Sequence, residues 1–147
     1  MKKAMIWLPS LLWMGLIFLM SAMPGDLSSA QSGAILEFIL HLLERIFPSG
    51  VPVSPDTLHL LIRKAAHMAE YAVLALLNLR ALRLSGAKRP ALHALLMTAT
   101  YAATDEYHQS FVDDRGPSAM DVLIDASGAM IALASHRIVS RLRTKRI

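Results

Sequence analysis

The stretch AMIWLPSLLWMGLIFLMSAM, residues 4–23, has no charged side chain and decides the fold class of this chain. A helix of about 20 residues is long enough to cross a bilayer core of roughly 30 Å. Lys2 and Lys3 precede the stretch, and Pro24 and Gly25 end it. A cleaved signal peptide is the alternative, but this run is longer than a usual signal core, and Pro24 is a poor cleavage context. We therefore expect a retained membrane helix.

The overall composition also favours a membrane protein. The chain has 147 residues, which is enough for one domain, and 54% of them are hydrophobic. It has no cysteine, which excludes disulfides, thiolate metal sites and cysteine nucleophiles. The net charge of +4 is compatible with nucleic-acid binding, but no basic helix with interleaved aromatic residues occurs. We therefore predict no nucleic-acid partner.

The positive charges gather in three segments that flank the apolar stretches. These are Lys2 and Lys3, then Arg80, Arg83, Lys88 and Arg89, then Arg137, Arg141, Arg143, Lys145 and Arg146. Under the positive-inside rule all three segments face the cytoplasm. The number of spans is then even, and both termini are cytoplasmic. The 11 Asp and Glu residues all lie elsewhere, together with Arg45, Arg63, Lys64 and Arg115.

The rest of the chain divides into further helices. Ser54, Pro55 and Asp56 are typical of a helix start, with a capping serine, proline in the first turn and an early acid. We predict an all-α fold in which residues 1–147 form a single domain, an integral membrane four-helix bundle. Its spans are expected at about 4–23, 60–84, 90–110 and 118–139.

The first outer loop has a different character from the spans. Residues 26–33 are rich in serine, and we expect them to form a loop. Residues 34–47 are too few to cross the bilayer, and Glu37, His41 and Arg45 recur at helical spacing. We therefore predict a short amphipathic helix that lies in the membrane interface.

Three of the expected spans carry polar side chains that are costly to place in lipid. We count heights at roughly 1.5 Å per residue from the cytoplasmic arginine that flanks each helix. His67 is then about 20 Å up, and Asp105 and Asp121 are both about 24 Å up. The candidate site is therefore a polar layer in the outer leaflet, formed by Lys64, His67, Glu70, Asp105, Glu106, Gln109, Arg115, Asp121 and Asp125.

Charge pairing suggests roles for these residues. Opposite charges at low dielectric must pair or titrate, so Lys64 and Arg115 are the expected counter-ions of the carboxylates, or bind an anion. His67 and Glu70 are three residues apart and are assigned to proton handling. The four other carboxylates, Asp105, Glu106, Asp121 and Asp125, are assigned to ion pairing or cation binding. Together with His67 these carboxylates are plausible ligands for a hard divalent ion, since oxygen ligands dominate. No spacing such as His-Glu-x-x-His occurs, however, so we predict no metal site and no cofactor.

At these residues the chain resembles the VanZ-like family of bacterial membrane proteins. The matching motifs are RKAAHMAEY at 63–71, DEYHQSF at 105–111, Arg115 and DVLIDASG at 121–128. The resemblance covers roughly residues 18–133. It implies a four-helix integral membrane protein of the cell envelope. The family takes its name from a protein linked to teicoplanin resistance in glycopeptide-resistant bacteria.

The sequence leaves several functions open. In the first, the polar layer binds the headgroup of a membrane lipid or lipid-linked envelope precursor, with Lys64, Asp105, Glu106, Gln109 and Arg115 in contact with it. In the second, the protein is a membrane-embedded hydrolase or transferase that acts on such a substrate. His67 with Glu70, and Asp121 with Asp125, would then be its acid/base pairs. A purely structural ion-pair network and a small proton-coupled transporter are further alternatives.

Overall fold

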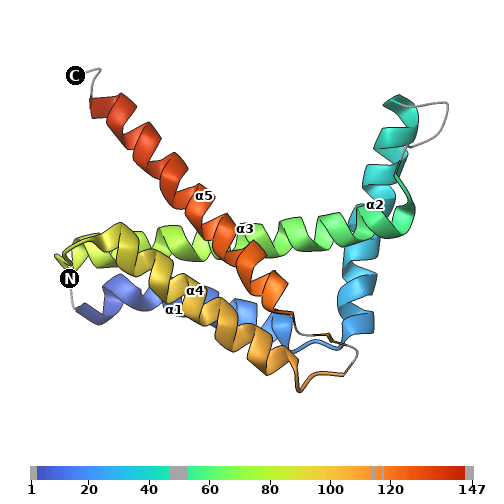
Figure 1. Ribbon diagram of the computed structural model, residues 1–147, viewed down its shortest axis with the longest axis horizontal. Helices are drawn as coiled ribbons and strands as arrows, with labels where there is room; N and C mark the ends of the chain where they lie inside the picture. Colours follow the sequence, from blue (N-terminus) through green and yellow to red (C-terminus); the bar gives the residue numbers. More distant parts are fainter. Residues whose placement is uncertain (1–2, 47–52, 114, 117, 145–147) are drawn as a thin grey trace.

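The computed structural model describes residues 3–46, 53–113, 115–116 and 118–144 of the chain. All the regular structure within these ranges is helical, which confirms the all-α prediction (Figure 1). The helices are α1 (Lys3–Ser21), α2 (Gly25–Ile46), α3 (Pro55–Leu84), α4 (Pro90–Gln109) and α5 (Ala119–Thr144).

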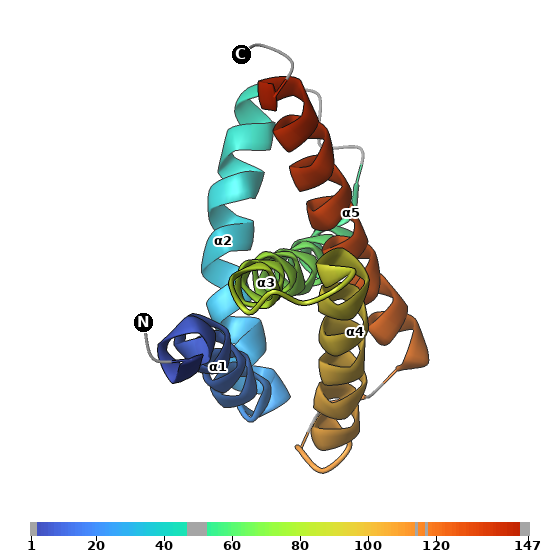
Figure 2. The ribbon, with the colours of Figure 1, turned by 90° about the vertical axis from the view of Figure 1, so that its left-hand side faces the viewer.

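The central element is α3, and each of the other four helices packs against it. Figure 1 shows α1 running roughly parallel to α3, while α4 slopes away from the end of α3 and α5 crosses α3 obliquely. Figure 2 looks along α3 and shows the other helices around it. The start of α1, the α3–α4 connection and the end of α5 lie toward one end of this arrangement (Figure 1). The α1–α2 and α4–α5 connections lie at the opposite end, which we call the loop end.

The helix start predicted at Ser54, Pro55 and Asp56 is confirmed as the start of α3, which has the expected cap. Ser54 has extended backbone angles, and its hydroxyl accepts a hydrogen bond of 3.3 Å from the Thr57 amide. Pro55 and Asp56 occupy the first turn, where a missing amide hydrogen and a negative charge are tolerated best. Gly86 ends the segment with a φ of +71°, a conformation that glycine adopts without strain.

The first outer segment differs from the prediction. The sequence indicated a loop over 26–33 and a short helix over 34–47, but one continuous helix, α2, runs from Gly25 to Ile46 and has 22 residues. Residue 47 lies outside the described ranges. The reason is that serine is only a moderately poor helix former, and no glycine or proline interrupts residues 26–32. This helix runs across the direction of α3, as an interfacial helix would (Figure 1).

The distribution of side chains differs from that of a typical water-soluble protein. Large apolar side chains such as Leu12, Leu19, Leu96 and Ile131 are exposed, whereas Asp105 and Asp125 are buried. Two helical stretches are long and apolar enough to cross a membrane, Ala4–Ser21 in α1 and Ala119–Thr144 in α5. The described part of the chain therefore has two candidate membrane helices by length and composition, and many large apolar side chains are exposed.

Polar contacts attach α1 to the two helices beside it. The Trp13 indole donates a hydrogen bond of 2.9 Å to the main-chain carbonyl of Glu70 in α3. The Tyr101 hydroxyl of α4 donates one of 2.6 Å to the carbonyl of Met14. These two bonds fix the position of α1 relative to α3 and α4.

The contact between α3 and α5 is close because Gly128 has no side chain. A Cβ atom placed on Gly128 would lie 2.3 Å from the main-chain oxygen of Met68, far inside contact distance. The missing side chain lets the two backbones approach each other. This approach sets how far apart the polar side chains of α3 and α5 lie one to two turns away.

Candidate functional site

A pocket of about 220 Å³ opens between α3, α4 and α5 toward the loop end. This volume is many times the roughly 10–15 Å³ that one water molecule needs. Six of the predicted site residues line it, namely Lys64, His67, Glu106, Gln109, Asp121 and Asp125. Leu60, Arg63, Gly116 and Ile124 complete the lining. The polar layer expected from helix heights thus encloses a space large enough for a small polar group.

Lys64 and Asp121 form an ion pair between α3 and α5 at this pocket. Lys64 has the counter-ion role expected for it. The two side chains are 32% and 33% exposed, so the pair remains in contact with solvent at the pocket mouth. An ion pair with this much exposure contributes little to stability, and its charges remain accessible to a ligand.

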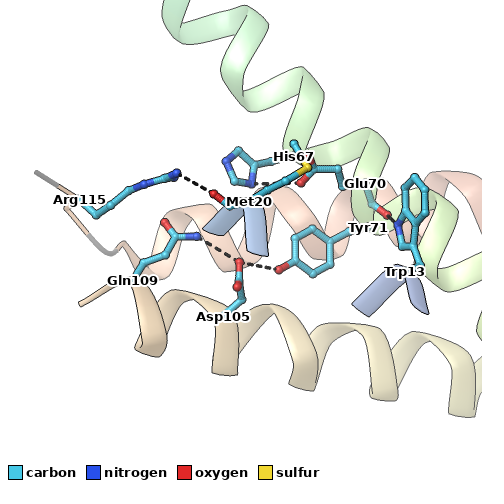
Figure 3. Close-up of polar contacts among 8 residues, drawn as sticks. All are labelled: Trp13, Met20, His67, Glu70, Tyr71, Asp105, Gln109 and Arg115. Carbon is cyan, nitrogen blue, oxygen red and sulfur yellow. Dashed lines mark hydrogen bonds and ion pairs between the residues drawn. The ribbon is translucent and has the colours of Figure 1, made fainter. Parts of the chain in front are cut away.

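Asp105 is the centre of a buried hydrogen-bond cluster next to the pocket. Its Oδ2 accepts a hydrogen bond of 3.0 Å from the Tyr71 hydroxyl and one of 3.1 Å from the Gln109 amide (Figure 3). The other oxygen, Oδ1, is buried and has no hydrogen-bond partner within the described part of the chain. The cluster joins α3 to α4 and orients Gln109, which also lines the pocket.

Arg115 has different partners from those expected. We predicted it as a counter-ion of the carboxylates, but its Nε donates a hydrogen bond of 3.3 Å to the Met23 carbonyl. Its Nη2 donates one of 3.3 Å to the Met20 carbonyl (Figure 3). A helix leaves its last carbonyls unpaired and carries partial negative charge at that end, so the end of α1 attracts a cation. Burial lowers the pKa of the Arg115 guanidinium, and the charge of Arg63 acts in the same direction. Arg115 does not line the pocket wall; it ties the α4–α5 loop to α1.

His67 and Glu70 are close but not hydrogen-bonded. The distance from His67 Nδ1 to Glu70 Oε2 is 3.9 Å, which is longer than a hydrogen bond (Figure 3). His67 lines the pocket, whereas Glu70 does not. The two residues are therefore placed near each other as predicted, but only the imidazole reaches the pocket.

The two remaining carboxylates of the pocket have different surroundings. Oε2 of Glu106 accepts a hydrogen bond of 2.9 Å from the Ser118 amide just before α5. This bond fixes the start of α5 relative to α4, much as a capping side chain does within one helix. Asp125 is 2% exposed and forms no hydrogen bond or ion pair with any residue that the structure describes. It is thus a buried carboxylate that faces a cavity without a partner.

Three contributors to this site are outside the list of candidate residues drawn from the sequence. Tyr71 lies one helical turn from His67 on the same polar face of the helix, but the sequence assigned it no role. Arg63 lies beside Lys64 and lines the pocket. The Ser118 amide is a main-chain group, for which side-chain patterns carry no signal. Within the described ranges, no group of three or more His, Asp or Glu side chains is arranged to hold a metal ion.

The comparisons with known proteins agree with the resemblance seen in the motifs. A family model described as VanZ/LLP1 matches residues 6–140 of the chain, which includes every residue of the pocket. Comparison with curated proteins and with solved structures gives no match.

Proposed function

This chain belongs to the VanZ/LLP1 family, and we propose that it is a multi-pass cell-membrane protein that crosses the bilayer four times, through α1, α3, α4 and α5. The exposed apolar surface supports this. It includes Leu12 and Leu19 on α1, Leu96 on α4 and Ile131 on α5. On α3, Leu61, Val73 and Leu76 are exposed as well. In water these exposed apolar surfaces would promote aggregation, whereas in a bilayer they contact the apolar acyl chains of the lipids.

We place both chain ends and the α3–α4 connection in the cytoplasm. The Lys and Arg residues of these segments favour that side, and the helix ends lie toward one end of the molecule (Figure 1). α2 then lies in the outer interface. Phe38, Leu42 and Ile46 are exposed at four-residue spacing, which suits an apolar stripe that rests on lipid.

This topology is testable because the chain has no cysteine. A single cysteine at Ser110 is expected to react with a membrane-impermeant maleimide added to intact cells. A cysteine at Ser85 is expected to react only after the cells are opened. Both residues are exposed and each follows directly on a helix, so they form a matched pair. Equal labelling of the two in intact cells would contradict the four-span arrangement.

We further propose that the pocket binds the phosphorylated headgroup of a membrane lipid or lipid-linked envelope precursor at the outer leaflet. The observation that carries this proposal is the composition of the pocket wall. Arg63 and Lys64 lie beside the apolar side chains of Leu60 and Ile124. Cations suit a phosphate, and neighbouring apolar groups suit the acyl chain joined to it. Such binding gives the protein a cell-envelope role, and through it a link to glycopeptide (teicoplanin) resistance.

A photoreactive phospholipid tests the headgroup site. With wild-type protein in vesicles, we expect crosslinks in the peptides that contain residues 60–67 and 121–125. The Arg63→Gln/Lys64→Gln variant should lose most of this labelling. Arg83→Gln, an exposed cation near the other end of α3, is the matched control and should label normally. Equal labelling of all three proteins at these peptides would refute the site.

Hydrolysis or group transfer on a lipid-linked substrate is the second candidate. The observation that favours it is that His67 and the unpartnered Asp125 line one pocket, since an imidazole and a carboxylate are common acid/base groups. Glu70 does not line the pocket, which weakens the predicted His67–Glu70 pair. Turnover of lipid-linked precursors by the purified protein decides between the candidates. A preparation without turnover that still restores the cellular phenotype would rule out catalysis.

A further inference from the structure

Asp125 is the most unusual side chain in the pocket. A buried carboxylate normally accepts hydrogen bonds or pairs with a cation, because leaving it without partners costs several kcal/mol. Asp105 has Tyr71 and Gln109, and Glu106 has the Ser118 amide. Asp125 is 2% exposed, lines the cavity and has no such partner among the described residues. The position therefore calls for a hydrogen-bond donor supplied from the cavity.

The pocket also holds an unpaired cation. Lys64 is paired with Asp121, but Arg63 forms no ion pair within the described ranges. Two unpaired groups of opposite charge, the Arg63 guanidinium and the Asp125 carboxylate, thus line the same cavity of about 220 Å³. A simple anion would satisfy only the first, and a simple cation only the second.

We propose that the pocket recognises a zwitterionic headgroup, a phosphate ester that carries a primary ammonium group. The phosphate lies beside Arg63, and the ammonium donates its hydrogen bonds to Asp125. This inference rests on the proposed headgroup site and specifies its ligand. A primary ammonium has three N–H donors, whereas a quaternary ammonium has none, so the carboxylate discriminates between them.

The depths of the two groups suit this orientation. Asp125 lies one helical turn beyond Asp121 along α5, which places it about 6 Å deeper from the loop end. Lys64, the partner of Asp121, is next to Arg63 in the sequence, so Arg63 lies near the pocket mouth. The phosphate therefore remains at the mouth, close to the apolar Leu60 and Ile124, while the amine enters first.

Lipid binding to the purified full chain tests the proposal. The probes are short-chain phosphatidylethanolamine, phosphatidylglycerol and phosphatidylcholine with the same acyl chains, and soluble O-phosphoethanolamine. We expect wild-type protein to bind the ethanolamine lipid about tenfold more tightly than the other two lipids, since a hydrogen bond to a charged group is worth at least that factor. Asp125→Asn should abolish this preference and still bind the glycerol lipid, which also shows that the variant is folded.

Two further variants complete the test. Arg63→Gln should weaken the binding of all three lipids, and Asp56→Asn, an exposed carboxylate in the first turn of α3, should change nothing. Soluble O-phosphoethanolamine that binds as tightly as the lipid would support the same chemistry from a soluble source. Weaker binding of the soluble compound would support the lipid.

The two ways of failing are distinguishable. Equal binding of the ethanolamine and glycerol lipids by wild-type protein, or a preference that survives Asp125→Asn, would overturn the zwitterion proposal and leave the headgroup site intact. If no lipid binds saturably, or if Arg63→Gln binds as well as wild type, the headgroup site itself is refuted, and the zwitterion proposal is refuted with it.

Discussion

The same three helices, α3, α4 and α5, are packed in two different ways along their length. In the half toward the chain ends, the core consists of small and aliphatic side chains, Ala75, Leu79, Leu82, Ala94, Ala129 and Leu133. In the half toward the loop end, the helices meet through Lys64 and Asp121, through the Asp105 cluster and around an open pocket. Gly128 lies between the two halves, next to Ala129 of the apolar core and one turn from Asp125.

The difference separates what holds the bundle together from what is available to a ligand. The apolar half gains its stability from close packing. It contains one buried hydrogen bond of 3.2 Å, from Asn78 to Thr98, and two uncharged buried atoms, Asn78 Oδ1 and His136 Nδ1, that have no partner among the described residues. In the polar half, charged side chains need hydrogen-bond or ion-pair partners, and Arg63 and Asp125 have none among the described residues. An ion-pair network that served only packing would be expected to fill its space, whereas this one surrounds a cavity. Variants that affect the two halves differently therefore test this division of roles.

The largest effect is expected where the halves meet. Gly128→Ala places a Cβ on the Met68 carbonyl, so α3 and α5 must separate. We expect a loss of about 3 kcal/mol of stability, at the upper end for overpacking because the contacted atom is main chain. Thermal unfolding in detergent measures it. The matched control is Gly15→Ala in α1, where a Cβ meets no atom within 4 Å. Equal unfolding midpoints for the two variants would contradict the close approach.

Arg115 tests how the polar half is anchored to α1. Arg115→Gln removes the charged hydrogen bonds to Met20 and Met23 and should cost about 2 kcal/mol. Arg115→Lys should recover only part of this loss, since an ammonium lacks the fork that reaches both carbonyls. Thermal unfolding measures both variants, with Arg83→Gln as the control. Full rescue by lysine would show that charge alone, without the hydrogen-bond geometry, holds the end of α1.

Much of the fold could be predicted because its signals are local. Ser54, Pro55 and Asp56 mark a helix start whatever surrounds them, and α3 begins there. The length of α2 could not be predicted, because serine is compatible with both a loop and a helix, and packing against α3 decides between them.

The part of the site that depends on the identity and helical spacing of side chains could be predicted from the sequence. Helical spacing and depth suggested that α3, α4 and α5 would each contribute to one layer, and the Lys64–Asp121 pair lies where opposite charges were expected to meet. The partners of Arg115 are main-chain carbonyls at a helix end, which exist only once α1 has ended nearby. The isolation of Asp125 likewise depends on how far apart the helices lie, a distance that no motif specifies.

Tyr71→Phe is a milder test of the polar half. It removes the hydroxyl that donates to Asp105 but leaves the Gln109 hydrogen bond in place. We expect a loss of about 1 kcal/mol in thermal unfolding, because a buried acceptor loses one of its two donors. Asn78→Leu in the apolar half is the comparison. It replaces a neutral hydrogen-bonding side chain by an apolar one of similar size in an apolar core and should cost less than Tyr71→Phe. The reverse order would mean that the apolar half depends on its polar pair more than the polar half depends on Asp105.

The smallest effect on stability is expected for Lys64→Gln, although its position in the pocket is central. The side chains of Lys64 and Asp121 are about one-third exposed, and solvent screens an ion pair of this kind to below about 1 kcal/mol. A double-mutant cycle with Asp121→Asn, followed by thermal unfolding, isolates the coupling between the two charges. We expect a small coupling that decreases further at high salt, together with clearly weakened crosslinking of the photoreactive lipid. A coupling of several kcal/mol with unchanged lipid labelling would reverse the comparison, because the polar half would then serve mainly to hold the helices together.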